Sequence, residues 1–345
     1  MTDAQWQILL DVIDGRTMAE LPAGFIIDSP WLPGWSGIST LDYYTSDELW
    51  FAANRRAVET FPEALFLPGF WSEYGMCTEP SAFGSKCVFH SRELPFAGPV
   101  IETPEQIDGL TVPDAATAGL APFMLNRLVL NRRRIEELGH AIRFAVVRGP
   151  LNVASFLMGA TEFLISLRTE PERAHRLLDL ITEYLVRSLE LQKQAIDSID
   201  GIFVLDDLVG FCGGPDIQEF AAPYLKRLFS AFPARVRFFH NDADGRNCAP
   251  HLAEMGINLF NFSFLHSIEE MQVWTGNAVA LVGNIPPRDV LALGTPEAVA
   301  QSVRDALAPV TDRTRLLCSC GGGMPDGVST ENVQAFIAAV RAAGR

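Results

Sequence analysis

A histidine and an aspartate, separated by one residue, end an apolar segment of the chain. His240 and Asp242 close the run RVRFFHND at residues 235–242. In an extended segment the side chains of residues i and i+2 point to the same side. An imidazole and a carboxylate, joined by a thiolate, would make a zinc site of three protein ligands with an open fourth position. The pair also fits a simpler interpretation, in which the histidine hydrogen-bonds a nearby carboxylate at a loop.

The best source of that thiolate is a cysteine pair near the end of the chain. Cys318 and Cys320 end the run RLLCSC and are followed directly by three glycines. Glycines remove side-chain bulk and let the backbone turn away, which exposes the neighbouring sulfur. Two cysteines at this spacing rarely bind one ion from a strand without strain, so we expect a single ligand. Cys320 is the preferred ligand, Cys318 is the alternative, and Cys248 is interpreted as a packing residue.

Three further carboxylates are candidates for catalytic roles. Asp206 and Asp207 end the apolar run GIFVLDD, where burying two adjacent charges without compensation would be costly. Adjacent strand residues face opposite ways, so only one of them can point into a site, to bind substrate, orient a ligand or hold a proton. A helix cap or an ion pair with an arginine is the alternative. Glu73 lies among aromatic residues and is predicted to be a carboxylate on a lid over the site.

The elements that must position these residues are short apolar strands alternating with helices. One such helix is expected at residues 172–196, with Thr169 and Glu172 in capping-box spacing. Strands separated by helices are typical of a parallel sheet buried on both faces, and their carboxyl ends meet at one face. The strand candidates are residues 144–149, 201–207, 235–242, 257–263, 278–284 and 315–320.

The pattern predicts an α/β fold, a (β/α)8 TIM barrel formed as one domain by residues 1–345. Residues 1–110 are rich in proline and tryptophan, and we interpret them as an irregular, aromatic-rich N-terminal extension that caps the barrel mouth. Residues 111–345 are then the barrel body. A doubly wound open sheet ranks second, because no G-x-G-x-x-G motif follows an early strand.

Composition excludes several classes of function. A formal net charge of -15 disfavours nucleic acid and anionic lipid, and the basic run Arg132-Arg133-Arg134 fits a solvated helix face. The start of the chain is acidic where a signal peptide is basic, and no apolar run approaches a membrane span, so a cytoplasmic protein is expected. The six cysteines are too sparse for a disulfide scaffold. Exposed N-terminal aromatic residues would favour a homodimer.

Two strings near the end of the chain resemble the uroporphyrinogen decarboxylase superfamily. They are ALVGNIPPRDVLALGTPEAVAQSVRDAL, with a strand ending in Gly-Asn before a proline turn, and the closing segment CGGGMPDGVSTENVQAFIAAVR. Further similar strings are RGPLNVASFLMG and PDIQEFAAPYLKRLF, so the resemblance covers roughly residues 70–345. It implies a barrel enzyme, and Asn284 at the Gly-Asn strand end is expected to contact a cofactor.

Within that superfamily the resemblance favours one branch. The decarboxylases carry an arginine-rich R-Q-A-G-R motif that binds substrate carboxylates, and the corresponding segment here has no arginine. The corrinoid-linked methyltransferases bind zinc through a His-x-Cys pair and a later Cys-Gly. These positions correspond here to His240 with Asp242, and to Cys320, so an aspartate replaces one cysteine. An oxygen ligand in place of sulfur suits activation of a harder heteroatom.

The resemblance therefore implies a methyltransferase with zinc, a small methyl donor or acceptor, and a methylcobalamin (corrinoid) carried by a separate protein. No cobalamin-binding D-x-H-x-x-G motif occurs in this chain. Two alternatives remain open: a metal-independent decarboxylase or lyase that uses His240 with Asp206 or Asp207, and a non-catalytic binding protein.

Overall fold

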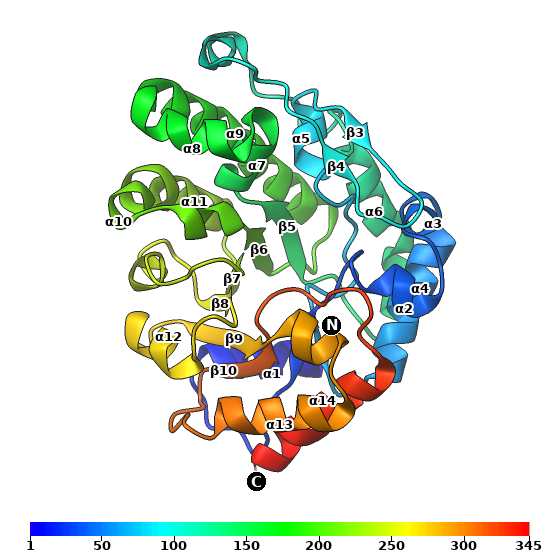
Figure 1. The fold of residues 1–345 in the computed structure, drawn as a ribbon. Helices are drawn as coiled ribbons and strands as arrows, with labels where there is room; N and C mark the ends of the chain where they lie inside the picture. Colours follow the sequence, from blue (N-terminus) through cyan, green and yellow to red (C-terminus); the bar gives the residue numbers. More distant parts are fainter. Residues whose placement is uncertain (345) are drawn as a thin grey trace.

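The computed structural model describes residues 1–344 and is built around parallel strands wrapped by helices (Figure 1). Six strands form one parallel sheet in the order β10-β9-β8-β7-β6-β5. Each of the six strands predicted from the sequence is found, within three residues at either end. Their bounds are β5 Phe144–Arg148, β6 Gly201–Leu205, β7 Val236–Asn241, β8 Leu259–Phe262, β9 Ala280–Ile285 and β10 Leu316–Cys320.

Two more parallel strands extend this sheet toward a closed barrel. β1 (Gly24–Ile26) pairs with β2 (Leu65–Leu67), and isolated parallel bridges join Ala23 to Cys318 and Ile26 to Gly323 beside β10. The eight parallel strands confirm the predicted (β/α)8 barrel. Both of the added strands come from residues 1–110, so this segment builds part of the barrel itself. A short antiparallel hairpin, β3 (Cys87–Val88) with β4 (Phe96–Ala97), also lies in it.

Side chains of the barrel strands alternate between two apolar cores. Phe203 and Phe238 belong to the inner core, and their rings stack with centroids 4.4 Å apart. The residues between them along each strand, such as Val204 and Phe239, belong to the outer core against the helices. Helix α1 (Asp3–Ile13) adds its apolar face to the inner core from below. This alternation decides which residues beyond each strand end can face the barrel mouth.

Helices cover the outside of the barrel (Figure 1). The long helix predicted at residues 172–196 is α9 (Pro171–Ala195), but the predicted capping box is wrong. Thr169 belongs to the preceding helix and donates its hydroxyl to the Ile165 carbonyl, while Glu170 is the N-cap and makes no side-chain cap. The other α-helices are α2 Leu32–Ser36, α3 Thr40–Thr45, α4 Asp47–Thr60, α5 Thr78–Ala82, α6 Ala121–Glu137, α7 Pro150–Met158, α8 Ala160–Thr169, α10 Gly214–Asp216, α11 Ala222–Phe229, α12 Ile268–Trp274, α13 Pro296–Leu307 and α14 Thr330–Ala343.

Five short helical turns have other geometries. Three are 3-10 helices, namely η1 Pro104–Gly109, η2 Asp207–Phe211 and η4 Ala249–His251; two are π-helical, namely η3 Ile217–Ala221 and η5 Pro287–Ala292. Within residues 1–344 no single helix is long and apolar enough to cross a membrane, and only the pair α7 and α8, bent by 106°, reaches that length together.

The tryptophans of the N-terminal segment are mostly buried. Trp6, Trp31, Trp50 and Trp71 are each at most 6% exposed. They therefore do not form the exposed aromatic surface on which the expectation of a homodimer rested. Arg132 and Arg133 of α6 pair with Glu136 and Glu137 one turn further on, as on a solvated helix face.

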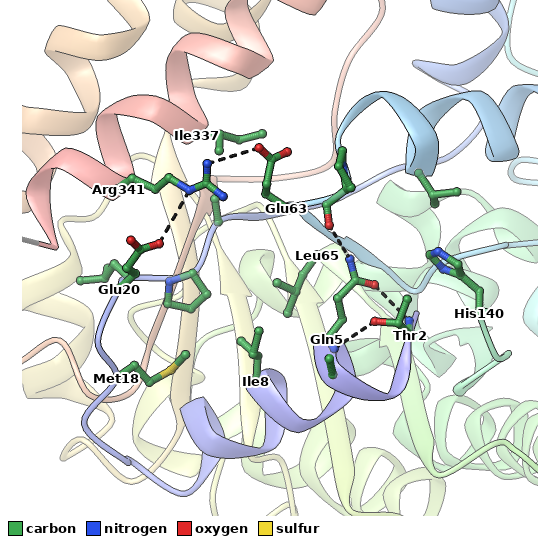
Figure 2. Close-up of a pocket in the computed structure, with 16 residues that line it drawn as sticks. Thr2, Gln5, Ile8, Met18, Glu20, Glu63, Leu65, His140, Ile337 and Arg341 are labelled. Carbon is green, nitrogen blue, oxygen red and sulfur yellow. Dashed lines mark hydrogen bonds and ion pairs between the residues drawn. The ribbon is translucent and has the colours of Figure 1, made fainter. Parts of the chain in front are cut away.

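A pocket of about 400 Å3 opens on the face opposite the strand carboxyl ends (Figure 2). α1 and the start of β2 line it, and Arg341 crosses it to pair with Glu20 and Glu63. His140 borders this pocket, and its Nδ1 makes no hydrogen bond within the described residues. Burial, reinforced by the nearby N-terminal ammonium, lowers the pKa of His140 to about 4.

His140 should make the fold sensitive to acid. Between its ordinary pKa of 6.5 and the folded value of about 4, the unfolded chain binds a proton that the folded chain does not. Stability is therefore expected to fall as the pH drops through this window, and His140→Phe should lessen that fall. Thermal midpoints measured from pH 7 to pH 4 test this, with exposed His90→Phe as the control. Parallel curves for wild type and His140→Phe would contradict it.

Candidate active site

Polar side chains gather where the barrel strands end. The alternation that places Phe203 and Phe238 inside the barrel also brings the next inward-facing residues to its mouth. The carboxyl ends of parallel strands are where such barrels carry their chemistry. In strand order these residues are Arg148 (β5), Asp207 (after β6), His240 (β7), Asp242 (after β7), Asn261 (β8), Asn284 (β9) and Ser319 (β10).

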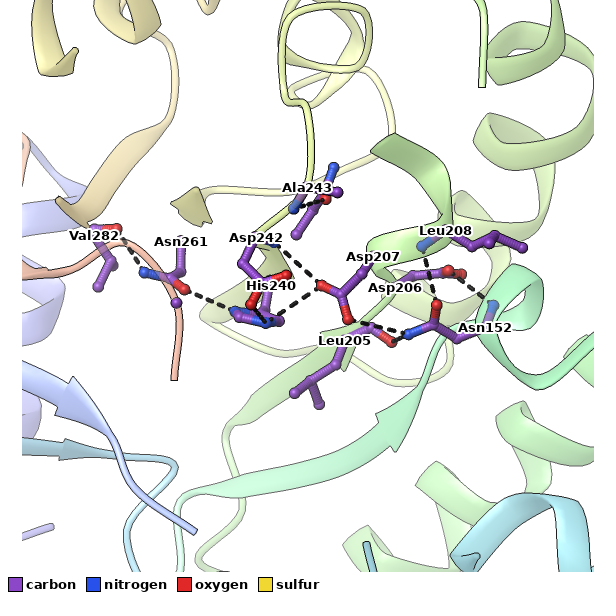
Figure 3. Close-up of polar contacts among 12 residues, drawn as sticks. Asn152, Leu205, Asp206, Asp207, Leu208, His240, Asp242, Ala243, Asn261 and Val282 are labelled. Atoms are coloured by element: carbon purple, nitrogen blue, oxygen red, sulfur yellow. Dashed lines mark hydrogen bonds and ion pairs between the residues drawn. The ribbon is translucent and has the colours of Figure 1, made fainter. Parts of the chain in front are cut away.

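Three of these side chains converge on one point (Figure 3). His240 Nε2 lies 3.4 Å from Asp207 Oδ1 and 3.9 Å from Asp242 Oδ2. The Asp242 backbone N–H donates to Asp207 Oδ1 at 3.2 Å, which ties the two acidic loops together. One ligand atom from each residue lies within 4.8 Å of the others, a spacing at which one cation could be held. We call Asp207, His240 and Asp242 the His–carboxylate trio.

Asn261 fixes which nitrogen of His240 faces the trio. The Asn261 side-chain nitrogen donates to the carbonyls of Val282 (2.8 Å) and Cys320 (3.2 Å), so its Oδ1 is left as an acceptor. This oxygen lies 2.7 Å from His240 Nδ1, which must therefore carry the proton. The lone pair of the neutral ring is then on Nε2, toward both carboxylates. A metal-binding histidine is held by the same type of contact.

Asn152 of helix α7 positions the second member of the trio. Its amide nitrogen donates to Asp207 Oδ2 and to the Leu205 carbonyl, each at 3.4 Å, while its oxygen accepts from the Leu208 N–H at 3.0 Å. The loop that carries Asp207 is thus held from both sides (Figure 3). Asn152 lies 55 residues before Asp207. Sequence reasoning missed it because nothing local to Asn152 indicates this contact.

Asp242 lies at the solvent side of the trio. Its side chain is 49% exposed, whereas His240 is buried. Partial burial of its carboxyl raises the pKa of Asp242, the nearby His240 opposes that rise, and the Asp207 carboxylate adds to it. Two carboxylates this close repel each other unless a proton or a cation lies between them.

Asp206 faces away from the trio. Its carboxylate accepts the backbone N–H groups of Leu151 and Asn152, each at 2.9 Å, at the start of α7. It is fully buried, and this burial raises its pKa well above the usual range. The structure therefore places Asp206 as a cap on α7, the alternative considered from the sequence, and Asp207 alone faces the mouth.

Cys320 is not brought together with His240. Strand alternation puts Leu317 in the inner core and both Cys318 and Cys320 in the outer core. The Cys320 thiol donates to the Gly322 carbonyl at 3.3 Å, and burial raises its pKa to about 12. The residue that does face the trio is Gly322, where an added Cβ would lie 3.3 Å from Asp242 Oδ2. Asp207 takes the place in the cluster that the sequence analysis assigned to Cys320.

Asn284 and Glu73 occupy other parts of the mouth. Asn284 donates its amide to the His266 carbonyl, which holds the loop after β8, and His266 in turn bonds Asp244 at 2.9 Å. Glu73 is 5% exposed and accepts the Gly75 N–H through one oxygen. Neither residue belongs to the trio. Cys248, expected to be a packing residue, is fully buried in the outer core.

The barrel and the polar groups at its mouth define an enzyme of the (β/α)8 class, and comparison with known proteins gives its family. The model described as "Uroporphyrinogen decarboxylase (URO-D)" matches residues 35–343, so the chain belongs to the uroporphyrinogen decarboxylase family. A methylated-thiol–coenzyme M methyltransferase of Methanosarcina mazei is 25% identical over 278 residues, which cover 78% of this chain and 71% of that protein. Uroporphyrinogen decarboxylase of Mannheimia succiniciproducens is 23% identical, covering 76% and 75%.

Solved structures agree on the fold. A methyltransferase from Methanosarcina mazei superposes with a TM-score of 0.80 at 20% identity and covers 96% of each chain. A B12-independent methionine synthase from Shewanella sp. W3-18-1 superposes with a TM-score of 0.59 at 13% identity, covering 94% of this chain and 96% of its own. The similarity in sequence includes both a methyltransferase and decarboxylases.

The cap formed by Asp206 can be tested by substitution. Asp206→Ala removes the acceptor of two buried N–H groups at the start of α7, so the free energy of unfolding should fall by about 1–3 kcal/mol. Asp206→Asn keeps one acceptor oxygen and should lose less. Chemical denaturation of the three proteins measures this. An Asp206→Ala protein as stable as wild type but inactive would instead assign the carboxylate to the chemistry.

Proposed function

We propose that this protein is a cytoplasmic methyltransferase that activates the heteroatom of a small methylated substrate or thiol at a zinc site and exchanges the methyl group with a corrinoid carried by a separate protein. The observation that carries the proposal is the His–carboxylate trio at the barrel mouth. Similarity to a methylated-thiol–coenzyme M methyltransferase supports the reaction class.

The number, type and spacing of the trio's ligand atoms suit a zinc ion. It offers three protein ligands, one nitrogen and two carboxylate oxygens, with ligand atoms within 4.8 Å of one another. Catalytic zinc sites use three protein ligands and keep a further position open. Asn261 accepts from His240 Nδ1, so the neutral ring would present the lone pair of Nε2 to an ion. When bound, zinc would stabilise the negative charge that develops on the heteroatom losing its methyl group.

Other residues of the chain orient the ligands of the trio and exclude water beneath it. Asn261 and Asn152 hold His240 and Asp207 in fixed orientations. Beneath them the aromatic rings of Phe203 and Phe238 fill the barrel, so water cannot reach the trio from below. The oxygen-rich ligand set favours a harder heteroatom, oxygen or nitrogen, over a sulfur substrate.

The same geometry supports one alternative function. A histidine nitrogen 3.4 Å from a carboxylate oxygen is also an arrangement for metal-free acid–base chemistry. In that case His240 and Asp207 would exchange a proton with the substrate of a decarboxylase or lyase, and similarity to uroporphyrinogen decarboxylases supports this candidate.

Metal content separates these candidates. We expect about one zinc per chain in purified wild-type protein, and its loss in His240→Ala and in Asp207→Asn, because each change removes one of only three ligands. Cys320→Ser should retain the ion, since this thiol lies in the outer core. Elemental analysis of the four proteins makes the measurement.

The outcomes are distinct. Loss of zinc in Cys320→Ser with retention in Asp207→Asn would replace Asp207 by the thiolate as ligand. Absence of metal from wild type, with none taken up from added zinc, would favour the acid–base alternative. Methyl transfer to free cob(I)alamin, followed by its visible spectrum, then tests the reaction itself.

Asn261 should increase the zinc affinity of the site without binding the ion itself. Asn261→Ala leaves His240 Nδ1 without its acceptor, so zinc affinity should fall about 10- to 100-fold. Competition with a chelator measures this affinity. Asn258→Ala, an amide change one residue before the same strand and away from the mouth, is the matched control. Equal affinity of Asn261→Ala and wild type would show that His240 needs no orientation by Asn261.

A further inference from the structure

A second cluster of charged side chains lies at the mouth, across the barrel from the trio. Asp28 follows β1 and Glu73 follows β2, whereas His240 is on β7. In the barrel order β1-β10-β9-β8-β7, β7 is four strands away from β1. Alternation places Ile26 in the inner core and Ile27 in the outer core, so Asp28 points inward. Arg148, at the end of β5, also points inward above Phe144.

This cluster holds more acid than base. Glu79 of α5 accepts the Arg148 backbone N–H at 2.8 Å, and its other oxygen lies 3.9 Å from Arg148 Nε. The Arg148 guanidinium donates to the Gly75 carbonyl through Nε and Nη2, at 3.2 and 2.9 Å, which fixes its position. We call Asp28, Glu73 and Glu79 the acidic cluster. One guanidinium thus faces three carboxyl groups.

Each member of the acidic cluster keeps an oxygen without a hydrogen-bond partner among the described residues. These atoms are Asp28 Oδ1, Glu73 Oε1 and Glu79 Oε2. The hydroxyl of Ser72, the residue before Glu73, is only 1% exposed and is also unpartnered. Because a buried polar atom without a partner costs free energy, several of them together indicate a missing ligand.

Electrostatic coupling links these groups into one site. Burial raises the pKa of Asp28 well above its usual range, the Glu73 carboxylate adds to that rise, and Arg148 opposes it. Burial also raises the pKa of Glu79, and Arg148 opposes that rise too. These raised pKa values favour protonated carboxyl groups, and a bound cation would displace those protons.

Two features favour an organic ammonium over a metal ion. The guanidinium of Arg148, which its bonds to Gly75 hold in place, repels a divalent ion about twice as strongly as a singly charged ammonium at the same distance. A primary ammonium carries three N–H donors, and Asp28 Oδ1 and Glu73 Oε1 are acceptors that have neither a hydrogen bond nor an ion pair among the described residues. The rings of Tyr44 and Tyr74 border Glu73; the Arg127 guanidinium already lies 5.2 Å from the Tyr74 ring centroid, and Tyr44 is the ring that would face an added positive charge.

We propose that the acidic cluster binds a primary ammonium group at the end of the substrate remote from the methyl group. The substrate class would then be methylated amines or ethers that carry a second, protonated amine. Binding energy from this non-reacting end would hold the methylated heteroatom at the trio. This proposal rests on the proposed function only in naming the end of the substrate that reacts. Binding of the ammonium group does not depend on methyl transfer.

The test uses two molecules of the same shape, 2-methoxyethylammonium and uncharged 1-methoxypropane. Ligand-observed NMR titration of the full-length protein should show that the ammonium binds at least about tenfold more tightly, since hydrogen bonds to charged groups are the strong ones. Glu73→Gln and, separately, Asp28→Asn should remove most of this preference. Exposed Glu102→Gln is the matched control and should retain it. Equal binding of the two molecules to wild type would overturn the proposal.

Two further measurements separate a binding role from a structural one. Glu73→Gln without ligand should melt no lower than wild type, because it removes an uncompensated buried charge. A large drop in melting temperature, together with an unchanged preference in Asp28→Asn, would assign the cluster to folding. His240→Ala should keep the ammonium preference while losing zinc, so failure of the zinc mechanism and failure of this proposal give different results.

Discussion

The alternation of side chains along each barrel strand is the constraint on which the site depends. A strand residue faces either the inner core or the helices, and its neighbours face the other way. Because Phe238 faces the inner core, His240, two residues later, faces the barrel mouth above the aromatic rings. Because Leu317 faces the inner core, Cys318 and Cys320 lie in the outer core. This alternation, or parity, determines which side chains line the mouth. Each strand contributes only the polar residues that lie an even number of positions after its inward-facing residues.

Parity also explains which features the sequence could predict. The six apolar runs predicted strands that are present, and the polar residues after them predicted the face that holds the trio. His240 and Asp242 lie together, as their spacing indicated. Cys320 was chosen for its chemistry and its glycines, although counting from Leu317 would have turned it outward. Asp206 and Asp207 were left open, although counting from Phe203 turns Asp207 inward and Asp206 toward the helices, where it caps α7.

Other parts of the site depend on contacts that local sequence does not contain. Asn261 reaches His240 from the neighbouring strand because Asn261 and His240 are paired in register. Asn152 reaches Asp207 from a helix that starts after a different strand. Hydrogen-bond partners of this kind are set by the closure of the barrel. The first 110 residues were equally hard to interpret, since strands of three residues, such as Gly24–Ile26, leave almost no periodic signal.

The charge of the mouth bears on the choice among the family's reactions. The acidic cluster and the His–carboxylate trio together contain five carboxyl groups, one arginine (Arg148) and one histidine (His240). The carboxyl groups are those of Asp28, Glu73, Glu79, Asp207 and Asp242. Such a field attracts cations and repels a substrate with several carboxylates. The segment that corresponds to the arginine motif of the decarboxylases begins directly after Asp28, and it contains no arginine. Under the proposed function, this charge favours a substrate that brings positive charge into the barrel over one that carries several carboxylates.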